Sequence, residues 1–366
     1  MAASPQLGLR AGEYVRVRSK EEILRTLDKT GRLEEMPFMP EMLKYCGKRF
    51  QVGKRAHKTC DPINGLESRR LTDAVHLEDL RCDGAQHGGC QAGCLLFWKE
   101  AWLVRDNDTA RQQPAASGGC TEGQMLAGVI AADSPVSGDD VTWVCQATQV
   151  AAATTPLKWW DLRQYVEDYR SGNAGIGRML AAVTFSAYHN LSNLGLGVGE
   201  GMRWLYDRFQ RLIGGSPYPW RPGQIPKGGR TPTVSKGIQE GDFVRIKSYK
   251  EILETLDEDW RNRGLYFDAE MVPFTNGTYR VRTRVDKIIH EKTGKMLQFK
   301  SPALILDDVV CAAKYAACRK LCPRGYFMYW REIWVDKVPA PAEAHCPEAA
   351  SLLCSEETPA CAPAGK

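Results

Sequence analysis

The stretch Gly12-Glu13-Tyr14-Val15-Arg16-Val17-Arg18-Ser19 recurs as Gly241-Asp242-Phe243-Val244-Arg245-Ile246-Lys247-Ser248, at an offset of 229 residues. The same offset, or one within a few residues of it, pairs further apolar and cysteine positions: Phe38 with Phe267, Cys82 with Cys311, Cys90 with Cys318, Cys94 with Cys322, Trp98 with Trp330 and Trp102 with Trp334. Self-similarity of this kind indicates a duplicated structural unit. The sequence therefore predicts a first module at residues 12–104 and a second module at residues 241–338.

Each module opens with apolar residues that alternate with Arg or Lys, a pattern typical of a half-buried strand. Ser19 and Ser248 then stand at the N-cap position of a short amphipathic helix, with Glu three residues later. Three further strands are expected in each module: 49–54 with 279–285, 75–77 with 304–306, and 98–104 with 330–335. Short strands around a small core predict an α+β fold with two barrel-like modules.

The opening motif Gly-[Glu/Asp]-aromatic-Val-Arg-[Val/Ile] resembles the first strand of SH3-like barrels of the KOW type or of the nitrile hydratase beta subunit. That resemblance implies that each module is an SH3-like barrel. Residues 39–47, MPEMLKYCG, and 329–334, YWREIW, resemble signatures of an uncharacterised bacterial family with a duplicated cysteine-containing module. This second resemblance implies no particular activity.

The modules flank a middle region at residues 124–216 that is expected to be mainly helical. Helical spacing of apolar residues covers 157–169, 176–191 and 202–213. Residues 179–198 contain no Asp, Glu, Lys or Arg, which favours a buried helical core or a partner surface over a membrane span. Residues 105–123 and 217–237 have the composition of linkers, and residues 339–366 that of a disordered tail.

The chain has 366 residues with a formal net charge of +5, too small an excess to make nucleic acid the default partner. Neither a membrane-spanning segment nor a secretory signal is expected, so we predict a cytoplasmic protein without membrane contact. Thiols stay reduced in that compartment. The odd number of 13 Cys then indicates metal ligation or redox chemistry.

Four metal donors are spaced similarly in the two modules. The first module holds Cys60, Cys82, Cys90 and Cys94; the second holds His290, Cys311, Cys318 and Cys322. Nitrogen and sulfur donors of this number fit a closed tetrahedral site, although buried cysteines can also serve as small apolar core residues. The ligand type and the Cys-to-His exchange favour zinc. An iron–sulfur cluster is the alternative, because Cys318-x3-Cys322-Pro323 resembles the end of a bacterial ferredoxin run.

Three more residues could replace one of these ligands: Cys46, His57 and His87. The sequence does not contain an evident acid–base constellation, which favours a metal-binding protein that acts as a binding module or scaffold for a protein partner. An iron–sulfur or zinc-dependent enzyme of a biosynthetic pathway is the alternative, and whether the protein is an enzyme is left open. RNA binding is a second alternative, through a basic stretch of the first module: Lys44, Lys48, Arg49, Lys54, Arg55 and Lys58.

Overall fold

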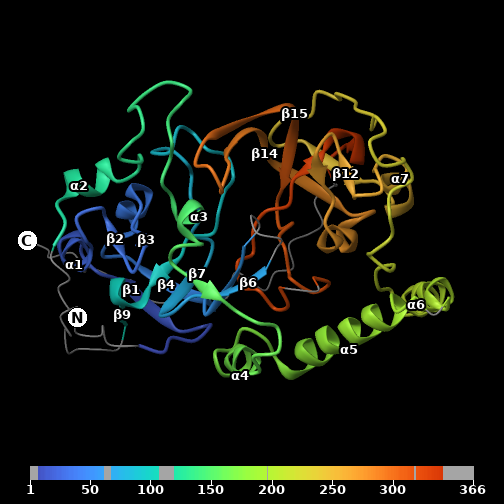
Figure 1. Cartoon of the computed structure of the whole chain (residues 1–366), viewed down its shortest axis with the longest axis horizontal. Helices are drawn as coiled ribbons and strands as arrows, with labels where there is room; N and C mark the ends of the chain where they lie inside the picture. Colours follow the sequence, from blue (N-terminus) through green and yellow to red (C-terminus); the bar gives the residue numbers. More distant parts are fainter. Residues whose placement is uncertain (1–6, 62–66, 107–118, 196, 317–318, 341–366) are drawn as a thin grey trace, which may run out of the picture.

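The computed structural model describes residues 7–61, 67–106, 119–195, 197–316 and 319–340. It combines helices with antiparallel sheets, which confirms the α+β class. Two five-stranded sheets lie on the left and the right of the molecule in Figure 1. None of the sheets formed by these residues closes on itself, so the barrel-like form of the modules stays a prediction. The predicted disordered tail lies outside the described residues from position 341 onward.

The two large sheets have the same strand order. The sheet of the first module is ordered β8-β7-β4-β1-β9, and that of the second module β16-β15-β14-β11-β17. The first contains β1 (Tyr14–Val17), β4 (Arg49–Arg55), β7 (Ala74–Leu77), β8 (Trp98–Lys99) and β9 (Leu103–Arg105). The second contains β11 (Phe243–Ile246), β14 (Thr278–Ile289), β15 (Met296–Leu306), β16 (Trp330–Arg331) and β17 (Val335–Val338). The strand that carries the repeated opening motif is therefore fourth in the order of both sheets, next to the edge strand.

A short capped helix follows the first strand of each sheet, as the sequence predicts. The helices are α1 (Lys20–Thr26) and α7 (Tyr249–Leu253). The Ser19 hydroxyl accepts the N–H of Glu22, while the Glu22 carboxylate accepts the N–H of Ser19. Ser248 caps α7 with Glu251 in the same way. Each capping box satisfies backbone donors that a helix end otherwise leaves free, which fixes where the helix begins.

Equivalent aromatic residues fill the two cores. Phe38 packs edge-on against Trp102 with ring centroids 5.1 Å apart, and Phe267 packs against Trp334 at 5.3 Å. The Trp102 indole donates to Thr26 Oγ1 at 3.1 Å, and the Trp334 indole donates in the same way to Thr255 Oγ1, two residues after α7, at 2.9 Å. Both cores therefore bury the same aromatic pair with its indole N–H satisfied.

The single strand predicted over 330–335 is wrong, because a 3-10 turn, η4 (Glu332–Trp334), divides it into β16 and β17. The single strand predicted over 98–104 is wrong for the same reason, because a 3-10 turn, η2 (Glu100–Trp102), divides it into β8 and β9. Glu100 is buried in this turn and accepts the backbone N–H groups of Gly8 and Leu9 at 2.9 and 3.0 Å. A buried carboxylate needs such donors. The chain therefore turns where the alternating pattern alone suggests that it stays extended.

The remaining short elements complete the modules and connect them to the middle region. Two small hairpins are formed by β2 (Arg32–Leu33) with β3 (Met36–Pro37), and by β12 (Arg261–Asn262) with β13 (Leu265–Tyr266). Further 3-10 helices are η1 (Pro40–Tyr45), η3 (Ala269–Phe274) and η4 (Glu332–Trp334). A three-stranded sheet joins β5 (Lys58–Asp61) and β6 (Glu67–Arg70) to β10 (Thr155–Pro156), which belongs to the middle region.

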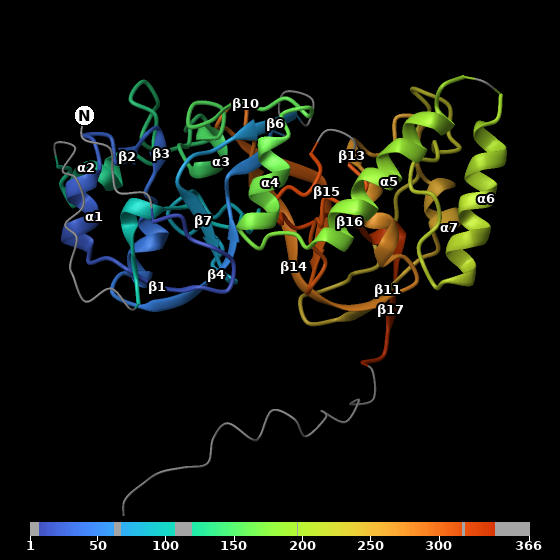
Figure 2. The ribbon, with the colours of Figure 1, turned by 90° about the horizontal axis from the view of Figure 1, so that it is seen from below.

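The middle region contains five helices in its described part: α2 (Glu122–Ala127), α3 (Gln146–Gln149), α4 (Arg163–Arg170), α5 (Ile176–Ser192) and α6 (Gly199–Leu212). The predicted helices at 176–191 and 202–213 are confirmed. A buried helical core is not what they form, since Leu180 and Val183 of α5 are 62% and 60% exposed. Figure 2 shows α4, α5 and α6 along the side turned to the viewer. No helix in the described residues is long and apolar enough to cross a membrane.

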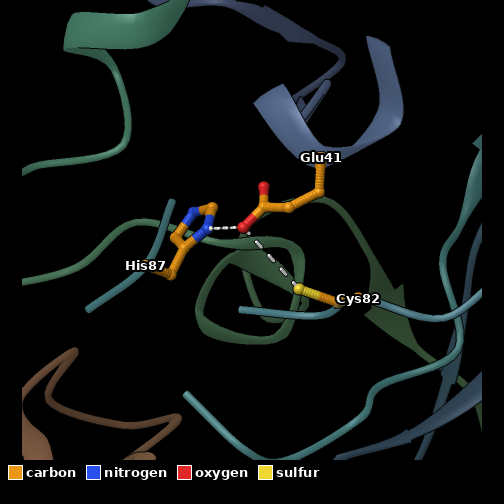
Figure 3. Close-up of side chains that lie close together, drawn as sticks. All are labelled: Glu41, Cys82 and His87. Atoms are coloured by element: carbon orange, nitrogen blue, oxygen red, sulfur yellow. Dashed lines mark hydrogen bonds and ion pairs between the residues drawn. The ribbon is translucent and has the colours of Figure 1, made fainter. Parts of the chain in front are cut away.

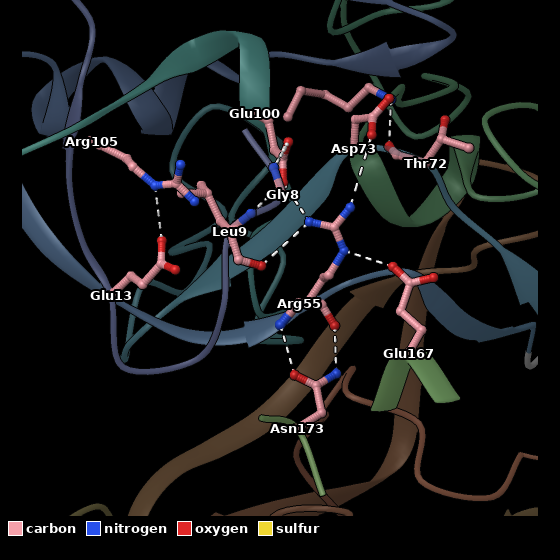
Figure 4. Close-up of polar contacts among 11 residues, drawn as sticks. Gly8, Leu9, Glu13, Arg55, Thr72, Asp73, Glu100, Arg105, Glu167 and Asn173 are labelled. Carbon is pink, nitrogen blue, oxygen red and sulfur yellow. Dashed lines mark hydrogen bonds and ion pairs between the residues drawn. The ribbon is translucent and has the colours of Figure 1, made fainter. Parts of the chain in front are cut away.

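An arginine of β4 fastens α4 to the first module (Figure 4). The Arg55 guanidinium contacts Glu100 of η2 at 2.5 Å and Glu167 of α4 at 2.8 Å. The Arg55 backbone N–H donates to Asn173 Oδ1 at 2.8 Å, and the Asn173 amide returns a hydrogen bond to the Arg55 carbonyl at 2.7 Å. The contacts are part-buried, so screening by water and salt weakens them less than exposed pairs.

Candidate metal centre

The loop after β7 brings three of the predicted ligands of the first module into one place. The Cys82 N–H donates to the Cys94 carbonyl at 2.8 Å, which closes the loop between them. Gly84, at φ +68°, lies so close to Cys90 that an added Cβ would meet the Cys90 carbonyl oxygen at 2.0 Å. Only glycine fits such an approach. The tight turn at Gly84 therefore holds Cys90 back toward Cys82 and Cys94.

A fourth cysteine, Cys145, comes from the middle region rather than from the repeat. Nε2 of His87, in the cysteine loop, contacts the Val144 carbonyl at 3.0 Å and so fixes the neighbouring Cys145 beside the loop. Cys145 is 8% exposed, and it packs in the same apolar cluster as Cys82, Cys90 and Cys94. All four sulfurs are free thiols. The first module thus gathers four thiols from two separate segments of the chain.

The thiols of this group lie close enough to influence one another electrostatically. Burial raises the pKa of Cys145 to about 11, and the nearby Cys90 adds to the rise. Burial likewise raises the pKa of Cys94 well above the ordinary thiol value, with further contributions from the neighbouring Glu291, Cys90 and Cys145. A buried cysteine without a bound metal therefore keeps its proton.

Backbone N–H groups point at the sulfur atoms. Gly84 donates to Cys82 Sγ at 3.3 Å, and Ile289 of the second module donates to Cys90 Sγ at 3.3 Å. Backbone hydrogen bonds from Thr148 and Ala147 also act on the Cys145 thiol and lower its pKa against the effect of burial. Such donors favour the thiolate over the thiol, and hydrogen bonds to sulfur tune the properties of thiolate-bound metals.

Cys60 lies with the cysteines of the second module, away from those of its own. It is 1% exposed on β5 and packs in the cluster that contains Cys311 and Cys322. A hydrogen bond between the Cys60 and Cys322 thiols lowers the pKa of Cys322 and raises that of Cys60. Burial raises the pKa of Cys311 to about 12. Cys318 lies outside the described residues.

The residue of the second module that is equivalent to Cys60 lies, in turn, with the cysteines of the first module. Ile289, at the 229-residue offset, ends β14 and packs in the core of the first module beside Cys90. Figure 1 shows the β14–β15 hairpin extending toward α3 and the first module. The crossing is held by Lys287, which donates to the Gly88 carbonyl at 2.8 Å, and by Gln91, whose N–H donates to the Lys287 carbonyl at 3.1 Å. Each module therefore contributes one strand end to the other's cysteine cluster.

His290 follows Ile289 and is exposed on the turn between β14 and β15. Its Nδ1 contacts Thr293 Oγ1 at 3.0 Å. The turn lies beside the cysteines of the first module, so the structure does not bring His290 together with Cys311 and Cys322. Cys60 occupies the place beside Cys322 that the sequence analysis assigns to His290.

A buried ion pair lies between the two cysteine clusters. Arg324, whose side chain is 6% exposed, contacts Glu291 Oε1 at 2.9 Å and donates to the Cys60 carbonyl at 3.0 Å. Glu291 stands two residues after Ile289, on the segment that reaches Cys90. The two clusters are thus connected through Ile289, Glu291 and Arg324.

A second set of donors shares Cys82 (Figure 3). Glu41, Cys82 and His87 each offer one ligand atom within 4.8 Å of the other two, and Glu41 and His87 are buried. Glu41 Oε1 contacts His87 Nδ1 at 2.6 Å, the Gln86 N–H at 3.1 Å and the Cys82 sulfur at 4.0 Å. Glu41 comes from η1, which places its carboxylate over the loop that follows Cys82.

The second module contains the same carboxylate without the histidine. Glu270 of η3 stands at the 229-residue offset from Glu41, and it accepts the backbone N–H groups of Lys314, Tyr315 and Ala316. Tyr315 replaces His87 in that loop. Both nitrogens of His87 contact oxygen atoms of the protein, Glu41 Oε1 at 2.6 Å and the Val144 carbonyl at 3.0 Å. Both ring nitrogens of His87 are therefore already engaged within the protein.

We expect the His87→Gln variant to keep its full metal content. The single side-chain amide of glutamine can contact Glu41 or the Val144 carbonyl, but it cannot replace both ring nitrogens of histidine. The free energy of unfolding should therefore fall by about 1–3 kcal/mol. Metal analysis of the purified variant and urea denaturation measure the two quantities. Loss of one metal equivalent would instead make His87 a ligand.

The alternative ligands and the basic stretch take other places. Cys46 is half-buried against the core of the first module, and His57 is buried with its Nε2 at 3.3 Å from Asp168 Oδ1. Two cations of the basic stretch are engaged inside the protein: Arg55 as described above, and Lys58, whose 1% exposed side chain pairs with Asp168 at 2.6 Å. The exposed cations that remain on this stretch are Lys44, Lys48 and Arg49.

Cys145 and Glu41 are absent from the ligands expected from the sequence. Cys145 has no partner in the repeat, and no spacing rule links it to residues far away in the chain. Glu41 did carry a signal, because an acidic residue recurs at position 270 next to apolar residues. Comparisons of the chain with models of known protein families, with curated proteins and with solved structures gave no match. Any assignment of function therefore rests on the geometry of the structure alone.

Proposed function

We propose that this chain is a metal-binding protein whose first centre is held by Cys82, Cys90, Cys94 and Cys145. The observation that carries the proposal is the packing of these four thiols, one buried and three half-buried, in one cluster, with backbone N–H groups at the sulfurs of Cys82 and Cys90. A core that needs only small apolar residues has no use for donors aimed at sulfur. Thiolates surrounded by such donors are ordinary ligands of zinc and of iron–sulfur clusters.

A second centre of the same kind is proposed at Cys60, Cys311 and Cys322. Its sulfurs come from both modules, because Cys60 crosses to the second module's core. Two basic residues accompany it: the buried Arg324 donates to the Cys60 carbonyl, and the part-buried Lys54 lies nearby with its pKa lowered by burial. Positive charge close to several thiolates offsets the cost of burying them. Metal at this centre would join the two modules to each other.

The two candidate metals make different demands on spacing. Zinc suits the ligand type, but Zn–S bonds of about 2.3 Å bring four ligand sulfurs to roughly 4 Å from one another. Apart from Glu41, Cys82 and His87, no three Cys, His, Asp or Glu residues in the described part of the chain place their ligand atoms within 4.8 Å of one another. The wider spacing of the thiols favours an iron–sulfur cluster, which places several atoms between its ligands.

Bound in these places, the metal has a structural role in this proposal. The first centre ties the middle region to the first module through Cys145, and the second ties the first module to the second through Cys60. Because metal-binding energy becomes folding energy in such sites, the bound metal stabilises the arrangement of all three parts. We infer a binding or scaffold protein whose outer surface contacts a partner.

The test is metal analysis of protein purified without oxygen, together with its visible spectrum and acid-labile sulfide. Brown protein with iron and sulfide identifies clusters, and colourless protein with zinc identifies single ions. The Cys94→Ser variant should lose about one centre and melt at a lower temperature, since the first module loses its metal. Cys120→Ser is the matched control, because Cys120 is buried in the same apolar cluster without another thiol acting on it.

Proton release gives an independent measurement. Burial keeps the metal-free thiols of Cys145 and Cys311 protonated, so metal must displace these protons when it binds. Uptake by the metal-free protein should therefore acidify a weakly buffered solution. If the purified protein contains no metal, and the metal-free protein neither takes up metal nor releases protons, these cysteines are core residues and the proposal is wrong.

A further inference from the structure

Helix α6 exposes most of its large apolar side chains, while Tyr206 and the charged Asp207 lie against the protein. Leu205, Phe209 and Leu212 are 58%, 55% and 86% exposed. Asp207, on the opposite side, accepts the Tyr218 N–H at 2.6 Å and pairs with Arg221 at 2.6 Å. Soluble helices normally bury the apolar stripe and expose the charges. No residue of α6 is buried, so the described chain does not cover this apolar surface.

Helix α5 carries an exposed apolar line of its own. Ile176, Leu180 and Val183 are each about 60% exposed, at the spacing that puts them on one side of the helix. Most of the exposed large apolar side chains of the described chain lie between residues 159 and 213, including Trp159, Trp160 and Trp204. The helices that carry or adjoin them, α4, α5 and α6, occupy one side of the molecule in both views (Figures 1 and 2).

The charges exposed on this segment are nearly all positive. Between residues 158 and 213 the exposed cations are Lys158, Arg163, Arg170, Arg178, Arg208 and Arg211. Glu200 is the exposed acidic residue among the described residues of the segment. The Arg208 guanidinium lies 5.8 Å from the centre of the Trp204 ring, so cation and aromatic ring share one place on α6.

We propose that the side formed by α4, α5 and α6 binds the surface of a membrane that contains anionic lipids. Some helices lie in the plane of the membrane interface and bury an apolar side at the boundary of headgroups and acyl chains. Such helices typically combine Trp, Leu and Phe with Arg. Anionic headgroups complement the excess of exposed cations. This mode of binding differs from a membrane span, replaces the expectation from the sequence that the protein makes no membrane contact, and does not depend on the proposed metal centres.

The observations favour lipid over two other occupants. A second copy of the chain would bring the same cations close to each other. RNA would satisfy the cations and stack on the tryptophans, but exposed aliphatic residues such as Leu180, Leu205 and Leu212 gain little from phosphate or bases. An acyl boundary accommodates both the aliphatic and the aromatic side chains.

The experiment is sedimentation of the full chain with vesicles of phosphatidylcholine alone and of three parts phosphatidylcholine to one part phosphatidylglycerol. We expect binding to the anionic vesicles that weakens with added salt. The triple variant Leu205→Ser, Phe209→Ser and Leu212→Ser should reduce partitioning at least about tenfold, because three apolar side chains no longer enter the interface. Arg208→Gln with Arg211→Gln should reduce it by about fivefold for each cation removed.

The matched control is Leu126→Ser, Val136→Ser and Leu297→Ser, which removes exposed apolar side chains outside this side of the molecule. It should partition as the unchanged chain does. Light scattering and RNA titration complete the test. Failure to bind the anionic vesicles overturns the proposal, and so does equal loss in the control variant. A dimer, or RNA binding, that the Leu205/Phe209/Leu212 variant abolishes while vesicle binding is absent assigns the surface to that other occupant instead.

Discussion

Replacing Cys60 by Ser is expected to empty the centre of the second module, although Cys60 belongs to the sequence of the first. Its side chain is 1% exposed among the residues that surround Cys311 and Cys322, and serine there removes a ligand. We expect the loss of about one metal centre and a fall of several kcal/mol in the free energy of unfolding, since metal binding contributes to folding. Metal analysis and urea denaturation provide the two measurements.

Double variants separate this expectation from a simple packing defect. Cys60→Ser combined with Cys322→Ser should lose no more metal than either change alone, because both act on one centre. Cys60→Ser combined with Cys94→Ser should lose both centres. Cys46→Ser, at a half-buried thiol outside both groups, is the control. If Cys60→Ser leaves the metal content unchanged, the proposed second centre is wrong.

Replacing Arg324 by Met is expected to lower the free energy of unfolding by about 3 kcal/mol. The change leaves the part-buried Glu291 without its cation and removes the donor to the Cys60 carbonyl, and breaking a buried ion pair from one side is strongly destabilising. Both metal centres should also bind less tightly, because Arg324 connects the segments that reach them. Denaturant titration with and without metal measures these effects.

Two comparisons check that the ion pair causes the effect. Arg282→Met removes an arginine that is half-exposed and pairs with Asp307 at 3.5 Å, and it should change stability by less than about 0.5 kcal/mol. Adding Glu291→Gln to Arg324→Met should recover part of the lost stability, since the unpaired carboxylate is then neutral. Equal effects of Arg324→Met and Arg282→Met would contradict the prediction.

The parts of the fold that the repeat predicted are those determined by local interactions. Ser19 with Glu22 requires only a turn of helix, and the alternating residues of β1 require only a neighbouring strand, so both can be inferred from short segments. The division of residues 98–104 into two strands could not be inferred. It depends on Glu100, whose burial is balanced by backbone donors at Gly8 and Leu9, more than 90 residues away.

The sequence indicated cysteines as candidate ligands, but only part of the set that the structure places in one cluster. Cys82, Cys90 and Cys94 lie in one loop, and their spacing alone brings them together. Cys60 and Cys145 depend on long-range packing, and a strand pattern is the same whether the strand returns to its own module or crosses to the other. The apparent equivalence of Cys60 and His290 followed sequence alignment, whereas the structure exchanges Cys60 with Ile289.

The exchange of strand ends makes the gene's two halves dependent on one another. A polypeptide ending before residue 217 would hold Cys60 without Cys311 and Cys322, and one starting there would hold Ile289 without the loop that it covers. Neither fragment alone therefore contains all the residues of its own core cluster. Produced together in one cell, the two fragments carry every element of both clusters, so assembly of the pair from separate chains becomes the equivalent of folding within a single chain.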